Sequence, residues 1–230
     1  MSNIAVILAG GSGKRFGSPT PKQFLTLAGK AVIEHSIDTF CQHPAIDEVA
    51  VVVHPDYRDT MQVLSDRRGW DKMKRIIDGG AERYESSLNA IRAYNAYPDD
   101  TRLLLHDAAR PLLSAETIGR VITALENHDA VGVGLPSTDT VWEVENGCID
   151  RIPERRKMWR AQTPQAFRLS ALSQAYEHAL KDPLFAATDD CGVLKRYMPL
   201  TDIFVVEGDE RNIKITTAGD LKLAEALIAS

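Results

Sequence analysis

Residues 4–24 are IAVILAGGSGKRFGSPTPKQF, an apolar run followed by a loop rich in glycine, proline and basic residues. A short, continuous apolar run that ends in glycines is typical of a buried parallel strand. Glycines let backbone N–H groups approach an anion, and lysine or arginine side chains add positive charge. The stretch therefore predicts a strand at 4–9 that leads into a phosphate-binding loop.

The loop does not fit either of the two common glycine-rich designs. The Walker A pattern requires Ser or Thr after its Gly-Lys pair, whereas Lys14 is followed by Arg15. In the dinucleotide pattern G-x-G-x-x-G, Gly11 and Gly13 fit, but Phe16 stands at the third glycine position. We therefore expect a different kind of phosphate loop. A tight turn with solvated basic residues is the alternative interpretation.

Prolines also shape the second half of the loop. Pro19 and Pro21 oppose the start of a helix, because proline fixes its own φ angle and restricts the residue before it. We expect a long, irregular loop that wraps over its ligand.

The rest of the chain alternates between apolar runs and helical patterns. Such alternation predicts βαβ units, hence an α/β, Rossmann-like, mostly parallel twisted sheet with helices on both faces. Ligands of such sheets bind at the carboxyl ends of the strands. No linker or repeat divides the sequence, so we expect one domain over residues 1–230. Further strands are expected at 49–54, 102–107, 130–135 and 203–208, and helices at 31–40, 86–96, 116–127, 169–181, 189–196 and 218–229.

A β-hairpin signal interrupts this alternation between residues 138 and 155. The segment TVWEVENGCIDRI has β-rich halves around Asn146 and Gly147, the strongest short hairpin signal. Trp142 and Val144 alternate with glutamates, which leaves one apolar face that needs cover. We expect a projecting β-arm at about 138–155 that a partner subunit covers. A hairpin folded back on its own domain is the alternative.

Composition excludes several classes of protein. Hydrophobic residues are 44%, charged residues 26% and the net charge is −5, without the basic excess of nucleic-acid-binding domains. No apolar window is long enough to span a membrane, and the N-terminus lacks the basic region of a signal peptide. The 3 cysteines form no C-x-x-C pair, which indicates free thiols. We expect a cytoplasmic protein with no nucleic-acid or membrane partner.

The loop LAGGSGKRFGSPTPKQF resembles the signature of sugar-nucleotide pyrophosphorylase-type nucleotidyltransferases. The spacing from Arg15 to Pro21-Lys22-Gln23 resembles one branch of them, the polyol-phosphate cytidylyltransferases. The resemblance spans essentially the whole chain and implies a nucleotidyltransferase domain that joins CTP to a polyol phosphate and releases pyrophosphate. Its further motifs are GGAERYESS (79–87), HDAARP (106–111), DT (139–140), QTPQAF (162–167), TDD (188–190) and NIKITT (212–217).

The resemblance implies which residues carry the chemistry. The attacking phosphate is already an anion, so positioning and electrostatic stabilisation supply the catalysis. Arg15 and Lys22 would contact the triphosphate and stabilise the pentacoordinate α-phosphorus. Lys214 would hold an oxygen of the incoming phosphate or of the α-phosphate. Mg²⁺ that bridges nucleotide phosphates needs few protein ligands, and no His/Cys/Asp cluster suggests zinc.

A second set of residues would bind the nucleotide. Backbone groups of Ala9, Gly10 and Gly80, with the Ser86 hydroxyl, match the family's base-reading positions. The family often has aspartate where this chain has Ala81. The implied nucleotide-binding residues are Ala9, Gly10, Gly11, Gly13, Gly80, Ala81, Arg83, Ser86 and Asp107, with Arg83 also supporting a helix start.

A third set would bind the polyol phosphate. Asp107 is also the candidate carboxylate for the divalent metal, bound directly or through water, and a simple turn residue is its alternative role. We interpret His106 as a packed or bridging residue rather than a base. In the family the β-arm crosses to the neighbouring subunit, which implies a homodimer with a shared site. The implied residues are Asp107, Arg110, Thr140, Arg155, Thr163 and Lys214.

Different motifs favour different polyol phosphates as the substrate. HDAARP and RAQTPQAF favour 2-C-methyl-D-erythritol 4-phosphate and isoprenoid precursor synthesis. LAGG, IPERRKMW and DDCGVL favour D-ribitol 5-phosphate and CDP-ribitol for teichoic acid or capsule. We favour the first. A non-catalytic nucleotide-binding paralogue is the alternative of another class, which the joint presence of Arg15, Lys22 and Lys214 opposes. A sugar-phosphate transferase that uses UTP or GTP is a weaker rival.

Overall fold

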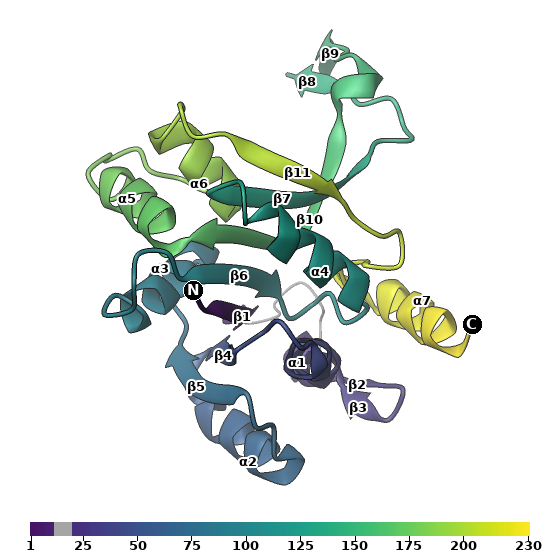
Figure 1. Cartoon of the computed structure of the whole chain (residues 1–230). Helices are drawn as coiled ribbons and strands as arrows, with labels where there is room; N and C mark the ends of the chain where they lie inside the picture. Colours follow the sequence, from purple (N-terminus) through teal and green to yellow (C-terminus); the bar gives the residue numbers. More distant parts are fainter. Residues whose placement is uncertain (12–19) are drawn as a thin grey trace.

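The computed structural model describes residues 1–11 and 20–230 and contains a seven-stranded central sheet (Figure 1). The strand order is β11-β7-β10-β6-β1-β4-β5. All expected sheet strands are confirmed, with ends shifted by at most a residue or so. They are β1 (Asn3–Ala9), β4 (Glu48–Val53), β6 (Arg102–Asp107), β7 (Ala130–Pro136) and β11 (Ile203–Glu207).

The sheet is mostly parallel, as the sequence predicts. Strand β1 pairs in parallel with β4 and β6, and the edge strands β5 and β11 pair in parallel with β4 and β7. Only β10 (Trp159–Arg168), among the described strands of this sheet, runs antiparallel, between β6 and β7. The carboxyl ends of β1 and β6 therefore lie next to each other at one edge.

Three of the longer elements are not predicted from the sequence, namely β5 (Met73–Asp78), β10 and the helix α2 (Arg58–Arg68). Strand β5 is an edge strand with basic residues in its middle, so its apolar pattern is weak. Strand β10 contains Pro164, and a register shift between Gln162 and Ala166 accommodates it.

Helices cover both faces of the sheet (Figure 1). The helices α1 (Val32–Gln42), α2 and α4 (Ala115–Ala124) pack against one face, into the core that Ala5 and Ile7 of β1 enter. The other core receives Ile4 and Val6, because successive strand side chains point to opposite faces. Its helices are α3 (Arg83–Ala93), α5 (Leu169–Ala179) and α6 (Asp190–Tyr197). The doubly wound arrangement is confirmed.

A smaller apolar cluster joins the two ends of the chain. It contains Leu27, Val32, Ile215 and Ala224, the last from the C-terminal helix α7 (Ala218–Ala229). Leu27 belongs to the short ribbon of β2 (Thr26–Leu27) and β3 (Lys30–Ala31), which follows the 3-10 turn η2 (Lys22–Phe24). This packing brings Leu27 and Val32 beside Ile215 of the NIKITT segment.

The expected hairpin is present as β8 (Glu143–Glu145) and β9 (Cys148–Arg151). Asn146 and Gly147 have φ angles of 50° and 79°, and a positive φ at both central residues is the signature of a type I′ turn. Residues 138–152 are all exposed, and the hairpin projects away from the sheet (Figure 1). It does not fold back on its own domain, so that alternative is wrong. The short turn η4 (Arg155–Lys157) closes its base, and η3 (Pro55–Tyr57) follows β4.

Candidate active site

A cavity of about 220 Å³ opens where β1 and β6 end, at the sheet edge where a ligand site is expected. It brings together most of the residues that the resemblance singled out, although their segments are far apart in sequence. Among the predicted site residues, its walls contain Ala9, Gly10, Gly11, Lys22, Gly80, Ala81, Arg83, Ser86, Asp107 and Lys214.

Glycine is required on one wall of this cavity. A Cβ atom on Gly80 would lie 2.1 Å from the Cβ of Glu85, and one on Gly10 would lie 2.6 Å from Ser86 Oγ. The Ser86 hydroxyl accepts a hydrogen bond from the Gly80 N–H at 3.2 Å. Arg83 begins α3 directly beside them, as expected of a helix-start residue. At Gly10 and Gly80 the wall is therefore backbone packed closely against the side chains of Ser86 and Glu85.

Gln23 is a wall residue whose role is not predicted from the sequence. Its side chain is buried, and its Nε2 donates to the backbone oxygens of Ala9 at 2.8 Å and Gly11 at 3.1 Å. These bonds fix the start of the glycine-rich loop to the 3-10 turn that carries Lys22. In the sequence, Gln23 is only a polar residue between Lys22 and Phe24, and this pattern does not predict hydrogen bonds to the backbone of Ala9 and Gly11.

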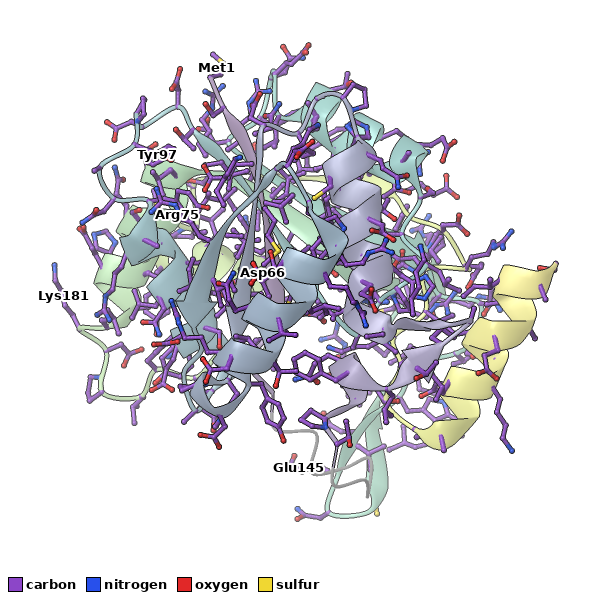
Figure 2. The ribbon with its side chains drawn as sticks, turned by 90° about the horizontal axis from the view of Figure 1, so that it is seen from below. Met1, Asp66, Arg75, Tyr97, Glu145 and Lys181 are labelled. Atoms are coloured by element: carbon purple, nitrogen blue, oxygen red, sulfur yellow. The ribbon has the colours of Figure 1, made fainter. Side chains whose placement is uncertain are left out.

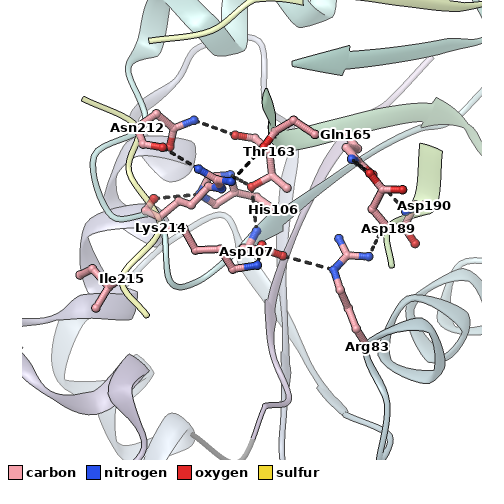
Figure 3. Close-up of polar contacts among 12 residues, drawn as sticks. Arg83, His106, Asp107, Thr163, Gln165, Asp189, Asp190, Asn212, Lys214 and Ile215 are labelled. Atoms are coloured by element: carbon pink, nitrogen blue, oxygen red, sulfur yellow. Dashed lines mark hydrogen bonds and ion pairs between the residues drawn. The ribbon is translucent and has the colours of Figure 1, made fainter. Parts of the chain in front are cut away.

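Charges converge on Asp107, the last residue of β6 (Figure 3). Its Oδ2 accepts a hydrogen bond from Lys214 Nζ at 2.7 Å, and its Oδ1 lies 3.4 Å from Arg83 Nε. Burial alone would raise the pKa of Asp107, but the charges of Arg83 and Lys214 outweigh burial and hold that pKa well below its usual range. Asp107 is therefore ionised at neutral pH.

Lys22 contacts the segment that carries Lys214. Lys22 Nζ donates to the backbone oxygen of Ile215 at 2.8 Å, and the N–H of Ile215 donates to the oxygen of Ala109, also at 2.8 Å. With Arg83, the described cavity wall therefore contains three cationic side chains and two carboxylates, those of Glu82 and Asp107. Such a surplus of positive charge in a partly enclosed site suits a polyanionic ligand.

His106 bridges two elements. It is fully buried, with Nε2 3.0 Å from the Arg110 oxygen and Nδ1 3.1 Å from Thr163 Oγ1. Burial lowers the pKa of His106 to about 4, so its ring is neutral near pH 7. The interpretation of His106 as a packed, bridging residue is confirmed.

Four of the predicted site residues that the structure describes lie outside the cavity wall. Thr163 Oγ1 accepts the backbone N–H of Asp107 at 3.1 Å, which fixes the end of β6. Arg110 donates from Nη1 to the oxygen of Asn212 at 2.7 Å and from Nη2 to that of Ala161 at 3.2 Å. Thr140 and Arg155 lie in the exposed arm and at its base. Their roles in substrate binding stay predictions.

Two predicted residues, Gly13 and Arg15, fall outside the described residues. Within the described residues, no group of at least three His, Cys, Asp or Glu side chains could hold a metal ion. The cysteines Cys41, Cys148 and Cys191 are free, as predicted.

Comparison with known proteins identifies the family. Residues 3–230 match the family model described as "IspD: 2-C-methyl-D-erythritol 4-phosphate cytidylyltransferase". The chain belongs to this family. The chain is 46% identical to the 2-C-methyl-D-erythritol 4-phosphate cytidylyltransferase of Thermobifida fusca (strain YX), over 97% of this chain and 92% of that protein. The membership confirms the resemblance that the motifs indicate.

Two further proteins are similar to the chain over nearly its whole length. It is 40% identical to the bifunctional ribulose 5-phosphate reductase/CDP-ribitol pyrophosphorylase Bcs1 of Haemophilus influenzae, over 99% of this chain but 48% of that protein. The crystal structure of 4-diphosphocytidyl-2C-methyl-D-erythritol synthase from Anaerococcus prevotii DSM 20548 matches with a TM-score of 0.87 and 30% identity, over 100% of this chain and 99% of that one. The α/β fold is confirmed. In the described residues, none of the helices has the length and apolar character to cross a membrane.

Proposed function

We propose that this chain, acting as one nucleotidyltransferase domain over residues 1–230, joins CTP to 2-C-methyl-D-erythritol 4-phosphate. The products are 4-diphosphocytidyl-2-C-methyl-D-erythritol and pyrophosphate. The observation that carries the proposal is a cavity that holds Lys22, Arg83 and Lys214 together with the ionised Asp107, beside a wall of glycines. Membership of the cytidylyltransferase family supports it.

The chemistry needs no protein nucleophile and no protein base. An oxygen of the methylerythritol phosphate forms a bond to the α-phosphorus of CTP, and the bond from that phosphorus to the α–β bridging oxygen breaks. Pyrophosphate leaves with the electron pair. The neutral, buried His106 has no proton to remove, because the attacking phosphate is already an anion.

Catalysis then depends on stabilising the extra negative charge at the α-phosphorus. We assign this role to Lys22 and Lys214, together with Arg15 from the loop outside the described residues. Lys22 and Lys214 are held by the Ile215 oxygen and by Asp107, so their ammonium groups are oriented before substrate arrives. A preorganised charge contact of this kind is typically worth about 3–4 kcal/mol in the rate.

The donor set fits a divalent metal that the nucleotide phosphates mainly hold. Mg²⁺ is commonly bound by one or two carboxylates and substrate phosphates rather than by an all-protein cage. Asp107 is an ionised carboxylate in the cavity wall, and no larger cluster of metal-binding side chains exists in residues 1–11 and 20–230. We propose Mg²⁺ as the metal, with Asp107 holding it directly or through water. When bound, it would neutralise part of the triphosphate charge.

The nucleotide is assigned to the glycine wall. Backbone groups of Ala9, Gly10 and Gly80, with the Ser86 hydroxyl, would distinguish the exocyclic amine of cytosine from the oxygen of uracil. Both donors and acceptors are available there, because backbone N–H and C=O groups and a hydroxyl line this side of the cavity. Gly11, Gly13 and Ala81 would pass close to the phosphates and ribose.

The polyol phosphate is assigned to a site completed by a second copy of the chain. Trp142, Val144 and Ile149 of the arm are 57%, 60% and 49% exposed, so a strip of large apolar side chains has no cover within the described part of its own chain. We propose a homodimer in which the arm brings Thr140 and Arg155 to the partner's cavity. Arg110, Thr163, Asp107 and Lys214 would complete the site.

A pyrophosphate-release assay with CTP and Mg²⁺ tests the function. We expect turnover with 2-C-methyl-D-erythritol 4-phosphate and little with D-ribitol 5-phosphate. The Bcs1 relative makes ribitol 5-phosphate the second candidate, and turnover with it alone would assign the chain to that chemistry. Turnover with neither would indicate a non-catalytic paralogue, and a preference for UTP or GTP would contradict the nucleotide assignment.

A further inference from the structure

A fully buried carboxylate lies behind the active-site cavity. Asp190, the first residue of α6, has no exposed surface. Its Oδ2 accepts a hydrogen bond from Arg83 Nη1 at 2.7 Å, and its Oδ1 accepts one from the Tyr176 hydroxyl at 2.7 Å. Its backbone N–H donates to Gln165 Oε1 at 3.0 Å. Each side-chain oxygen therefore has a fixed partner, and Asp190 is anchored in place.

Arg83 connects this buried carboxylate to the site. Its Nη1 binds Asp190, while its Nε lies 3.4 Å from Oδ1 of Asp107, whose other oxygen accepts from Lys214. The four side chains form a series of alternating charge that runs from the protein interior into the cavity (Figure 3). The contact of Arg83 with Asp190 is the shorter of its two ion pairs, so Asp190 has the stronger hold on the guanidinium.

We propose that Asp190 is a positioning residue for the cytidylyl transfer. By fixing Arg83 it limits how closely the guanidinium can approach Asp107, and so leaves Asp107 bound to Lys214. Without the charge of Asp190, Arg83 would turn fully to Asp107 and compete with Lys214 for the carboxylate. The inference rests on the proposed function, because the reaction needs Lys214 in its place.

The contacts within this series keep Arg83 charged and Tyr176 protonated. Burial would lower the pKa of Arg83, but the carboxylates of Asp190 and Asp107 raise that pKa above its ordinary range. Burial, with the charge of Asp190, raises the pKa of Tyr176, so its hydroxyl remains a donor. Asp190 is the fully buried member of the ion pair, so loss of Arg83 or Tyr176 would leave its charge without a replacement partner from solvent.

A second cluster, also built from a carboxylate, an arginine and tyrosine hydroxyls, provides a matched control. Glu48 accepts hydrogen bonds from Tyr94 Oη at 2.6 Å and Arg75 Nε at 3.1 Å. Glu48 is the first residue of β4, so it lies at the opposite end of the parallel strands from the cavity, which is at their carboxyl ends. Arg75 and Tyr97 of this cluster lie side by side, far from Glu145 of the arm (Figure 2). Loss of the Glu48 carboxylate should affect the stability of the fold without affecting the cavity.

The test is a double-mutant cycle on kcat/KM for methylerythritol phosphate. Asp190→Asn should lower kcat/KM about 10- to 100-fold in the wild-type background, because small misplacements in such sites are costly. In an Arg83→Gln background the same change should cost less than about 2-fold, since two residues that act through one contact are not additive. Glu48→Gln should stay within about 2-fold in both backgrounds.

The readouts separate positioning from folding. The CTP-binding stoichiometry, measured by calorimetry, should remain at the wild-type value in Asp190→Asn, so that the loss is in turnover by folded enzyme. Equal losses from Asp190→Asn in both backgrounds, or equal losses from Asp190→Asn and Glu48→Gln, would overturn the inference. If Asp190→Asn does not fold, Tyr176→Phe removes one anchor of Asp190 and should show the same background dependence with a smaller loss.

The two proposals fail in different ways. A folded wild-type protein that releases no pyrophosphate from CTP and methylerythritol phosphate contradicts the proposed function. An active wild-type protein whose kcat and KM are unchanged by Asp190→Asn contradicts the role of Asp190 alone.

Discussion

Lys22 donates a hydrogen bond to the backbone oxygen of Ile215, 2.8 Å away, across 193 positions of sequence. Lys214, the neighbour of Ile215, binds Asp107. The two lysines assigned to the reacting phosphates are therefore fixed relative to each other by one short segment. Their joint action depends on the geometry of that segment as well as on their charges.

Lys22→Ala should lower kcat about 100- to 1,000-fold and change the Kd for CTP much less, because a charge that acts mainly on the transition state affects rate more than binding. Steady-state pyrophosphate release and calorimetric titration with CTP measure the two quantities. Lys74→Ala, at an exposed lysine of β5, is the control and should behave as wild type. A weaker Kd with unchanged kcat would show that Lys22 only anchors the ground state.

Gly80→Ala should raise the KM for CTP about 10-fold or more. The new Cβ would lie 2.1 Å from the Cβ of Glu85, so the wall must move into the space assigned to cytidine. Gly119→Ala in α4 is the control, because a Cβ there meets nothing closer than 3.8 Å and alanine favours a helix. A wild-type KM for CTP in Gly80→Ala would remove this wall from the nucleotide site.

Asp38 should make the free energy of unfolding depend on pH in the acid range. Burial raises the pKa of Asp38, but hydrogen bonds from Lys30, Trp70 and Arg68 outweigh it and lower that pKa. As pH falls, the unfolded chain takes up the proton first, near its pKa of about 3.9. The stabilising contribution is therefore complete above that pH and is lost as pH falls through the lower, folded pKa.

Asp38→Asn tests this by chemical denaturation at several pH values. At pH 7 it should lower the free energy of unfolding by about 2 kcal/mol, the usual loss for hydrogen bonds to a charged group. The gap to wild type should close below about pH 4. Asp66→Asn, at an exposed residue of α2, should follow the wild-type curve. A gap that is independent of pH would mean that Asp38 acts through packing rather than charge.

Val144→Asp should convert the proposed dimer to a monomer. An unpaired charge in the centre of an apolar interface is costly, and Val144 is 60% exposed in the single chain. Light scattering after gel filtration measures the mass, and the KM for methylerythritol phosphate should rise because the partner's arm is missing. Leu184→Asp is the control, since this residue is exposed but lies in the segment between α5 and α6. A wild-type protein that is monomeric at assay concentration would contradict the shared site.

Local signals explain which elements could be predicted from sequence. The apolar run at β1 and the Asn146-Gly147 turn encode their structures within a few residues, and both are confirmed. Strand β10 could not be predicted as well, because it depends on pairing with β6 and β7 and on an irregularity around Pro164. Edge strand β5 has too few apolar positions to separate it from a loop.

In the candidate site, too, residues in local motifs could be predicted, whereas residues that act through distant contacts could not. Asp107, Lys214 and Gly80 could be selected from sequence because each lies in a compact motif, and the structure brings all three to one cavity. Gln23 and Asp190 were not assigned roles, since Gln23 acts through backbone oxygens and Asp190 through an arginine 107 residues away. A motif shows that a residue belongs to a pattern, but only the folded chain shows which atom it holds.

The small apolar cluster beneath α7 has a consequence for how the rate can be tuned. Leu27 and Ile215 belong to this cluster, and each lies within a few positions of one of the two lysines that we assign to the reacting phosphates. The spacing of two ammonium groups is thus set by aliphatic packing on the far side of the backbone. A change of side-chain volume at Ala224, with no change of charge anywhere, would shift both lysines together and so alter turnover from outside the site.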